Sequence, residues 1–294
     1  MTILELDRVT RRYRRTEALN QVSLRIDQPQ VVGLLGRNGA GKSTLLRLIP
    51  PLIGADSGTV RVFGNDPWSH QEANKLRLGY LADTDIHPPG LRAQDLFDLC
   101  ASVYPTWDPA LVDRFADRFE VQRRKPLGQL SKGQQRQVGL LCAVGHRPEL
   151  LVLDEPAGGL DPVARRDFLS VVIEVLADSG GTVLFASHLF ADIERLAERI
   201  VILDRGRVIL DDPLDAVRSQ SCRVEVSGDD ALLARLRAWT PCVHAASASG
   251  RITASLRLAP DDARTRLASE LGATVDEAQA VGLEDFFIAL TEAP

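Results

Sequence analysis

VVGLLGRNGAGKSTLLRLI, from Val31 to Ile49, indicates the fold class more clearly than any other stretch of this sequence. Val31–Leu35 is a short apolar run that predicts a buried strand, and Lys42–Ile49 predicts a helix that the two following prolines end. Between them, Gly36 to Ser43 match the pattern G-x-x-x-x-G-K-[ST]. The glycines let backbone N–H groups curl around a phosphate, and the helix N-terminus adds its positive dipole. The stretch therefore predicts a phosphate-binding loop.

The loop and the first helical turn hold the residues that we expect to bind a nucleotide. Lys42 can reach the β- and γ-phosphates of a nucleoside triphosphate, and the Ser43 hydroxyl suits Mg²⁺. ATP and Mg²⁺ are therefore the expected cofactors. The expected phosphate-binding residues share this one turn and are Gly36, Asn38, Gly39, Ala40, Gly41, Lys42, Ser43 and Thr44.

A second buried strand is predicted at LLVLDEP, Leu150 to Pro156, and it ends in two carboxylates. Asp154 is placed to hold Mg²⁺ through water, and Glu155 to polarise an attacking water. Carboxylates at a strand end can also act as helix caps. Beside a phosphate-binding loop, catalysis is the better interpretation.

The stretch LSKGQQRQ, Leu130 to Gln137, narrows the class of ATPase. Ser131 is the expected N-cap of a helix through Val144, where its side chain and the Gly133 N–H can bind an anion. A capped helix alone is ordinary. Here it lies shortly before LLVLDEP, and AGGLDP (Ala157 to Pro162) and Ser187-His188 follow in order.

In this order the motifs resemble those of the ATP-binding cassette (ABC) ATPases, over about the first 215 residues. GRNGAGKST is similar to the family's Walker A motif, LSKGQ to its signature and LLVLDE to its Walker B motif. GLDP is similar to the D-loop and Ser187-His188 to the switch. Five motifs in the family's order make the resemblance very specific.

The resemblance implies an α/β fold, a P-loop NTPase cassette with a RecA-like core, an antiparallel β subdomain and a helical subdomain at about residues 84–146. It also implies that two cassettes pack head to tail, with Ser131, Gly133 and Gln134 of one on the γ-phosphate held by the other. Because this chain carries one cassette, a second cassette is an expected partner. The expected catalytic residues are Glu155, His188 and Lys42.

One position departs from the family pattern. Where ABC cassettes usually have a glutamine that contacts Mg²⁺ and the attacking water, LGYLADTD has Asp83. We expect Asp83 to approach the metal, as a third metal-site residue beside Ser43 and Asp154. The alternative is a shifted loop, in which Asp83 or Asp85 caps a turn and Gln94 serves nearby.

The basic run RRYRR, Arg11 to Arg15, could bind nucleic acid through its arginines and its aromatic ring. The whole chain argues against this, because its 35 basic and 40 acidic residues give a formal charge of −5. Tyr13 stands 23 residues before Gly36, close to where the family places an aromatic residue that stacks on adenine. We therefore expect Tyr13 to contact the base of ATP, the arginines to form a solvated strand edge, and no nucleic acid to bind.

Other features indicate a cytoplasmic protein. The chain has no stretch of about 18 apolar residues and no apolar signal-peptide core at its start. Its four cysteines lie far apart and form no CxxC pair, so reduced thiols are favoured over a zinc site; they are Cys100, Cys142, Cys222 and Cys242.

The sequence predicts two domains, an ABC domain over residues 1–219 and a small α+β domain of unknown role over residues 222–294. In the second, RVEV and RITASLRL favour strands and Asp229–Trp239 favours a helix. A second helix and a short strand near Thr274 give the order a ferredoxin-like look. Phe286 and Phe287 belong to a final amphipathic helix.

The resemblance implies the nucleotide-binding subunit of a membrane exporter, which hydrolyses ATP as a dimer, peripheral on the inner face of the cell membrane. Its partner there is a separate transmembrane permease subunit, which the helical subdomain touches. The alternative is a soluble ABC ATPase of translation or DNA repair. Those proteins usually carry two cassettes or a long coiled coil, whereas Lys42 and Ser131 are 89 residues apart with no heptad array between them. A catalytically dead binding module is disfavoured, because every expected catalytic residue is present.

Overall fold

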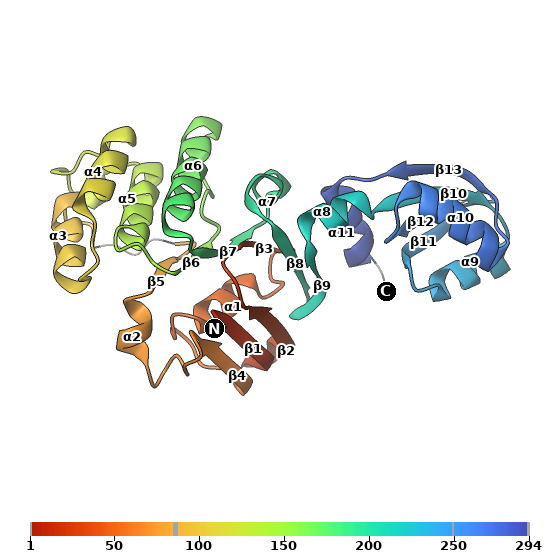
Figure 1. The fold of residues 1–294 in the computed structure, drawn as a ribbon, viewed down its shortest axis with the longest axis horizontal. Helices are drawn as coiled ribbons and strands as arrows, with labels where there is room; N and C mark the ends of the chain where they lie inside the picture. The colour runs from red at the N-terminus through yellow and green to blue at the C-terminus, as the bar shows by residue number, and fades with distance from the viewer. Residues whose placement is uncertain (1, 85–87, 249, 293–294) are drawn as a thin grey trace. The chain divides into compact units, whose positions relative to one another are not determined.

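The computed structural model describes residues 2–84, 88–248 and 250–292. The chain divides into two compact units, Met1–Leu210 and Asp211–Pro294 (Figure 1).

The first unit is built on a six-stranded sheet in the order β5-β6-β7-β3-β8-β9. The four neighbouring pairs from β5 to β8 are parallel, and the central strands are almost completely buried, as apolar runs covered on both faces should be. The strands are β3 (Val31–Leu35), β5 (Leu78–Leu81), β6 (Leu150–Asp154), β7 (Thr182–Ser187), β8 (Arg199–Asp204) and β9 (Arg207–Pro213).

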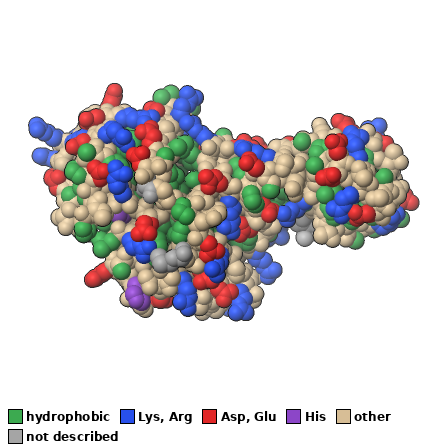
Figure 2. All heavy atoms as spheres, in the orientation of Figure 1, with side chains coloured by type: hydrophobic (Ala, Val, Ile, Leu, Met, Phe, Trp, Pro, Cys, Tyr) green, Lys and Arg blue, Asp and Glu red, His purple; other side chains and the backbone are tan. Residues whose placement is uncertain are grey.

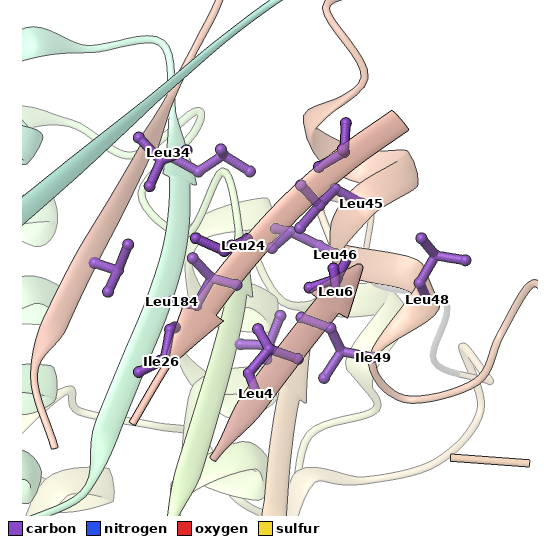
Figure 3. Packing of buried hydrophobic residues seen from close by; sticks show 14 of the residues in the cluster. Leu4, Leu6, Leu24, Ile26, Leu34, Leu45, Leu46, Leu48, Ile49 and Leu184 are labelled. Carbon is purple, nitrogen blue, oxygen red and sulfur yellow. The ribbon is translucent and has the colours of Figure 1, made fainter. Parts of the chain in front are cut away.

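A second, antiparallel sheet lies beside the parallel one in the order β2-β1-β4, with β1 at Leu4–Tyr13, β2 at Thr16–Ile26 and β4 at Ser57–Val62. Helix α1 (Lys42–Leu48) packs its leucines on both sheets, as Figure 3 shows. Leu45 and Leu46 are fully buried, and burial of each side chain contributes about 1.5–3 kcal/mol. This packing anchors the helix that follows the phosphate loop.

Helices α3, α4 and α5 of the first unit lie together, with α3 and α4 packed on α5 and α5 against β5 (Figure 1). The segment predicted as a helical subdomain contains α3, α4, a short 3₁₀ turn and α5. Asp108 caps α4 by accepting a hydrogen bond from the Leu111 N–H at 2.9 Å. The helices are α2 (Gln71–Lys75), α3 (Ala93–Val103), α4 (Pro109–Arg118), α5 (Lys132–Val144), α6 (Pro162–Ser179) and α7 (Phe190–Leu196), and the 3₁₀ turn is η1 (Leu127–Gln129).

The second unit contains a four-stranded antiparallel sheet in the order β11-β12-β10-β13. Two helices connect its strands in the ferredoxin-like sequence β-α-β-β-α-β, in which β11 is a strand that the sequence did not predict. The apolar residues of its core come from this sheet and from α9 and α10. Its elements are α8 (Leu214–Ser219), β10 (Cys222–Ser227), α9 (Asp230–Ala238), β11 (Cys242–Ala248), β12 (Arg251–Leu256), α10 (Pro260–Leu271), β13 (Val275–Ala280) and α11 (Leu283–Glu292).

The predicted fold class, an α/β cassette followed by a small α+β domain, is confirmed. The contact division falls after Leu210, whereas the sequence places the end of the cassette at Ser219. We keep the assignment of residues 1–219 and 222–294 to separate domains as a proposal. No helix among the described residues is long and apolar enough to cross a membrane.

Candidate nucleotide-binding site

The phosphate loop has a backbone that only glycine adopts easily. Gly39 and Gly41 have φ values of 81° and 108°, in the left-handed region where a side chain is strained. A Cβ on Gly36 would lie 2.4 Å from the Leu203 carbonyl oxygen. The loop therefore keeps its N–H groups at the start of α1 without side chains in the way. Asn38 and Ala40 lie in the same loop, and Thr44 lies in the first turn of α1.

Lys42 is only 7% exposed, and its side chain bends back over the loop. The Nζ atom donates to the Gly36 carbonyl at 2.7 Å and lies 3.7 Å from Glu155 Oε1. The lysine is thus held beside the carboxylate that the sequence singled out for catalysis.

Ser43 and Asp154 meet although they lie far apart in the sequence. The Ser43 hydroxyl donates to Asp154 Oδ1 at 3.0 Å. The other oxygen, Oδ2, is buried and has no hydrogen-bond partner among the described residues. Burial raises the pKa of the Asp154 carboxyl, and the Ser43 hydrogen bond opposes that shift. A buried carboxylate oxygen with a free lone pair next to a serine hydroxyl suits a hard cation such as Mg²⁺.

Glu155 and His188 form a direct contact at the ends of two neighbouring strands. Strands β6 and β7 are paired with Asp154 opposite Ala186, so the residues that follow each strand lie side by side. His188 Nδ1 lies 2.8 Å from Glu155 Oε2. Glu155 has a φ of 47°, a conformation that costs energy in a residue with a side chain. This backbone conformation places the carboxylate between Lys42 and His188.

The predicted metal-site residue Asp83 is exposed and lies just after β5. Its charge is near enough to Asp154 to raise the pKa of that carboxyl, after the larger effect of burial. In the alternative interpretation, Gln94 serves the metal. Gln94 lies on α3, where its amide donates to Asp98 Oδ1 at 2.8 Å. Asp85 lies outside the described residues.

The signature residues make their hydrogen bonds within the N-terminus of α5. The Gln134 N–H donates to Ser131 Oγ at 3.2 Å, and the Ser131 N–H donates to the Gln134 side chain at 3.1 Å. This reciprocal pair is a capping box, and it leaves Ser131 exposed at the start of the helix. A Cβ on Gly133 would lie 3.1 Å from Leu160 Cδ2, so a larger residue there would require the Leu160 side chain to shift by a few tenths of an ångström.

Tyr13 is 41% exposed at the end of β1, with the Arg11 guanidinium 5.0 Å from its ring centroid. The two arginines that precede it have acidic partners. Arg11 pairs with Asp56 at 2.9 Å and Arg12 with Glu17 at 2.8 Å. On the face shown in Figure 2, basic and acidic side chains are interspersed. The exposed ring leaves a face for a planar base.

Sequence reasoning missed one residue that contacts this site. Arg136 on α5 is buried and donates to main-chain carbonyls that flank Glu155. Arg136 is visible in the sequence as the arginine of LSKGQQRQ, but the sequence interpretation of this stretch considered only the residues around its N-cap.

These elements together define a P-loop nucleotide-binding cassette, with Lys42, Ser43, Asp154, Glu155 and His188 at one sheet edge. Comparison with known proteins identifies the particular family. Residues 19–158 match the family model described as ABC transporter. The chain is 31% identical over 288 residues to the ABC transporter ATP-binding protein YtrB of Bacillus subtilis, covering 98% of this chain and 97% of that protein. The chain belongs to the family of ABC transporter ATP-binding proteins.

Two further comparisons agree. The daunorubicin resistance ATP-binding protein DrrA3 of Streptomyces coeruleorubidus is 33% identical over 225 residues, which cover 75% of this chain and 71% of that protein. A solved ATP-binding subunit of an ABC transporter superposes with a TM-score of 0.67 at 29% identity, over 74% of this chain and 92% of that structure.

Proposed function

We propose that this protein is the ATP-hydrolysing subunit of an ABC membrane exporter and works as a head-to-tail dimer. The observation that carries the proposal is the position of the Glu155 carboxylate, with one oxygen 2.8 Å from His188 and the other 3.7 Å from Lys42. A carboxylate held between these groups, beside a phosphate loop, can act on a water molecule at the γ-phosphate.

ATP binding uses residues from several segments of the first unit. Tyr13 stacks on adenine, and the loop N–H groups hold the phosphates. Lys42 exchanges its contact with the Gly36 carbonyl for phosphate oxygens, which places its positive charge where negative charge develops during transfer. Ser43 and Asp154 would hold Mg²⁺, which would supply charge compensation on the phosphates.

Hydrolysis depends on Glu155 as the general base. It accepts a proton from the attacking water while the water oxygen bonds to the γ-phosphorus. The bond between that phosphorus and the oxygen bridging to the β-phosphate then breaks, giving ADP and phosphate. His188 keeps the carboxylate oriented through Nδ1 and contacts the γ-phosphate.

A second cassette completes each site in this proposal. Ser131 is exposed at the N-terminus of α5, where a hydroxyl and N–H groups can bind an anion supplied by another molecule. Its hydrogen bonds lie within its own helix cap rather than with its own phosphate loop. The dimer therefore places the Ser131 of each cassette against the γ-phosphate held by its partner.

A separate permease subunit is the proposed membrane partner, which would hold the protein on the inner face of the cell membrane. A hollow of about 370 Å³ lies between the core and the helical segment, with Leu52, Ala82 and Tyr104 in its lining. On α3, the side chains of Leu99 and Val103 are more than half exposed to solvent. Apolar side chains exposed on a helix whose Cys100 lines this hollow suit a protein partner. Leu99→Glu is expected to weaken copurification of the permease without changing ATP binding.

The alternative, a soluble ABC ATPase of translation or DNA repair, is less well supported. The described helices between Lys42 and Ser131 are short, the longest being α3 with 11 residues, so no long coiled coil interrupts the described part of the cassette. The relative named for daunorubicin resistance and the one named as an ABC transporter ATP-binding protein favour transport, and the former favours export.

Purified protein is expected to hydrolyse ATP with Mg²⁺, and Lys42→Ala should reduce turnover by about 100-fold or more, since it removes charge compensation in a dry site. Lys125→Ala, in the loop before η1, is the matched control and should keep wild-type turnover. Turnover measured as released phosphate tests this. Equal rates for Lys42→Ala and wild type, in a preparation free of other ATPases, would refute the assignment.

A further inference from the structure

Arg136 is a buried cation in the signature helix α5 that takes no direct part in the nucleotide contacts proposed above. Its side chain is only 5% exposed. A cation removed from water needs compensating hydrogen bonds, so the partners of Arg136 indicate what the residue does.

Three of these partners are consecutive main-chain carbonyls at the end of β6. Nη2 donates to the carbonyls of Asp154 at 2.6 Å and Glu155 at 2.9 Å, and Nε donates to that of Pro156 at 3.0 Å. The first two carbonyls stand on either side of the Glu155 Cα. The hydrogen bonds to these two carbonyls therefore restrain both φ and ψ of Glu155, the residue that we propose as general base.

Glu155 needs such support because its φ of 47° lies in the left-handed region. A residue in that region keeps its conformation only when its surroundings hold it there. Two hydrogen bonds from one rigid guanidinium supply that restraint. The conformation in turn directs the carboxylate toward Lys42 and His188.

The other side of the guanidinium reaches a different segment. Nη1 donates to the Ala82 carbonyl and to the Asp83 carbonyl, the latter at 3.3 Å. These residues follow β5, and Ala82 lines the hollow that we propose for the permease. One planar side chain thus joins the signature helix, the base and the wall of the hollow.

We propose that Arg136 is a positioning residue for the ATP hydrolysis proposed above, on which this inference rests. Its guanidinium fixes the backbone of Glu155 and holds Ala82 and Asp83 against it, so that the Glu155 carboxylate faces the γ-phosphate. A lysine cannot replace it, because an ammonium offers three donors from one point instead of a planar fork.

The kinetic test is Arg136→Lys. Turnover should fall by about tenfold or more, whereas ATP affinity should stay within about twofold, because the phosphate loop is unaltered. In the Glu155→Gln background the same change should cause no further loss. The matched control is Arg118→Lys on α4, whose guanidinium donates to the side chains of Glu174 and Ser170; it should keep wild-type turnover. Rates are compared below the melting temperature of each variant.

A second readout needs no ATP. Amide hydrogen exchange should increase in Arg136→Lys within residues 81–84 and 154–158, and stay unchanged in α1. The exchange measurement tests the backbone role of Arg136 independently of ATP hydrolysis. If the wild-type protein lacks Lys42-dependent turnover, the proposed function is refuted, but the exchange result still decides whether Arg136 holds the Glu155 backbone. Should a buried ammonium prevent folding, Arg136→Gln, which is neutral and keeps two N–H donors, carries both tests. Unchanged exchange in both segments, turnover within about twofold of wild type, or a loss that multiplies with that of Glu155→Gln would overturn the proposal.

Discussion

The Glu155 carboxylate shows at the residue scale how the proposed ATP hydrolysis depends on contacts between distant parts of the sequence. Lys42, Glu155 and His188 lie on three different segments, and strand pairing brings them together. The motifs and the family resemblance single out these residues as catalytic, and the structure brings them together, while their catalytic role stays a proposal. The motifs could not predict Arg136, because an arginine within a helix is usually solvated and only the fold shows its carbonyl partners.

Asp83 offers a test of the metal site at the same scale. Burial is the main cause that raises the pKa of Asp154, and the nearby Asp83 charge adds to it, which favours a position of Asp83 near the proposed cation. Asp83→Gln removes one negative charge, so the Mg²⁺ concentration that gives half-maximal turnover should rise by about threefold to tenfold, with little change in nucleotide affinity. Magnesium titrations of turnover measure this. An unaltered magnesium dependence and rate would place Asp83 away from the metal.

At the scale of elements, local pattern predicted the strongly marked helices and strands well. Helix α5 begins one residue after the predicted N-cap and ends at the predicted Val144. Strand β11 was missed, because CVHAASA is rich in alanine and serine and has little β-propensity. Its position is fixed by antiparallel pairing with the next strand, β12, from Cys242 opposite Leu256 to Ala248 opposite Arg251, and the residues of the segment alone do not show this pairing.

His146 joins two elements and should make stability depend on pH. It follows α5, its ring stacks on Tyr104 with centroids 4.0 Å apart, and Nε2 lies 3.2 Å from the Leu78 carbonyl of β5. Burial lowers the pKa of His146 from 6.5 to about 4. Between these two pH values the ring is neutral in the native state, whereas in the unfolded chain it is protonated. The stabilisation is present above pH 6.5 and is lost as the pH falls toward about 4.

Urea unfolding of wild type and His146→Gln at several pH values measures this effect. The wild-type free energy of unfolding should fall more steeply than that of the variant between about pH 6.5 and pH 4, by up to about 3 kcal/mol. Carboxyl titrations affect both proteins equally and cancel in the difference. A difference that stays constant over this range would contradict the account.

At the scale of the whole molecule, the chain forms two compact units, and the site residues of the proposal all belong to the first. Sequence alone predicted two domains because the motifs stop before the last 75 or so residues, and it placed the boundary near Ser219, where the cassette pattern ends. Contacts with a second cassette or a permease cannot be predicted from local sequence patterns, because they depend on surfaces of two molecules. The feature of this chain that suggests binding to a second cassette is the signature, whose residues cap their own helix α5.

A chain that ends after Ser219 is expected to fold and bind ATP. It keeps β9, which belongs to the six-stranded sheet, and it removes β10 to α11, which hold none of the proposed site residues. The affinity for a fluorescent ATP analogue should stay within about threefold of the full-length value. A folded truncation without ATP affinity would show that the second unit contributes to the site.

The measurement that tests the central claim most directly is sedimentation of Glu155→Gln with and without ATP. Glutamine keeps the size of the side chain but cannot accept the proton, so ATP stays bound at both sites and should hold two chains together. We predict a dimer with ATP and a monomer without it. In this background Ser131→Asp keeps a good N-cap for α5 and sets a negative charge against the partner's γ-phosphate, so it should restore the monomer. A Glu155→Gln protein that binds ATP yet stays monomeric at high concentration, or a dimer that Ser131→Asp leaves intact, would contradict the head-to-tail ATPase proposed here.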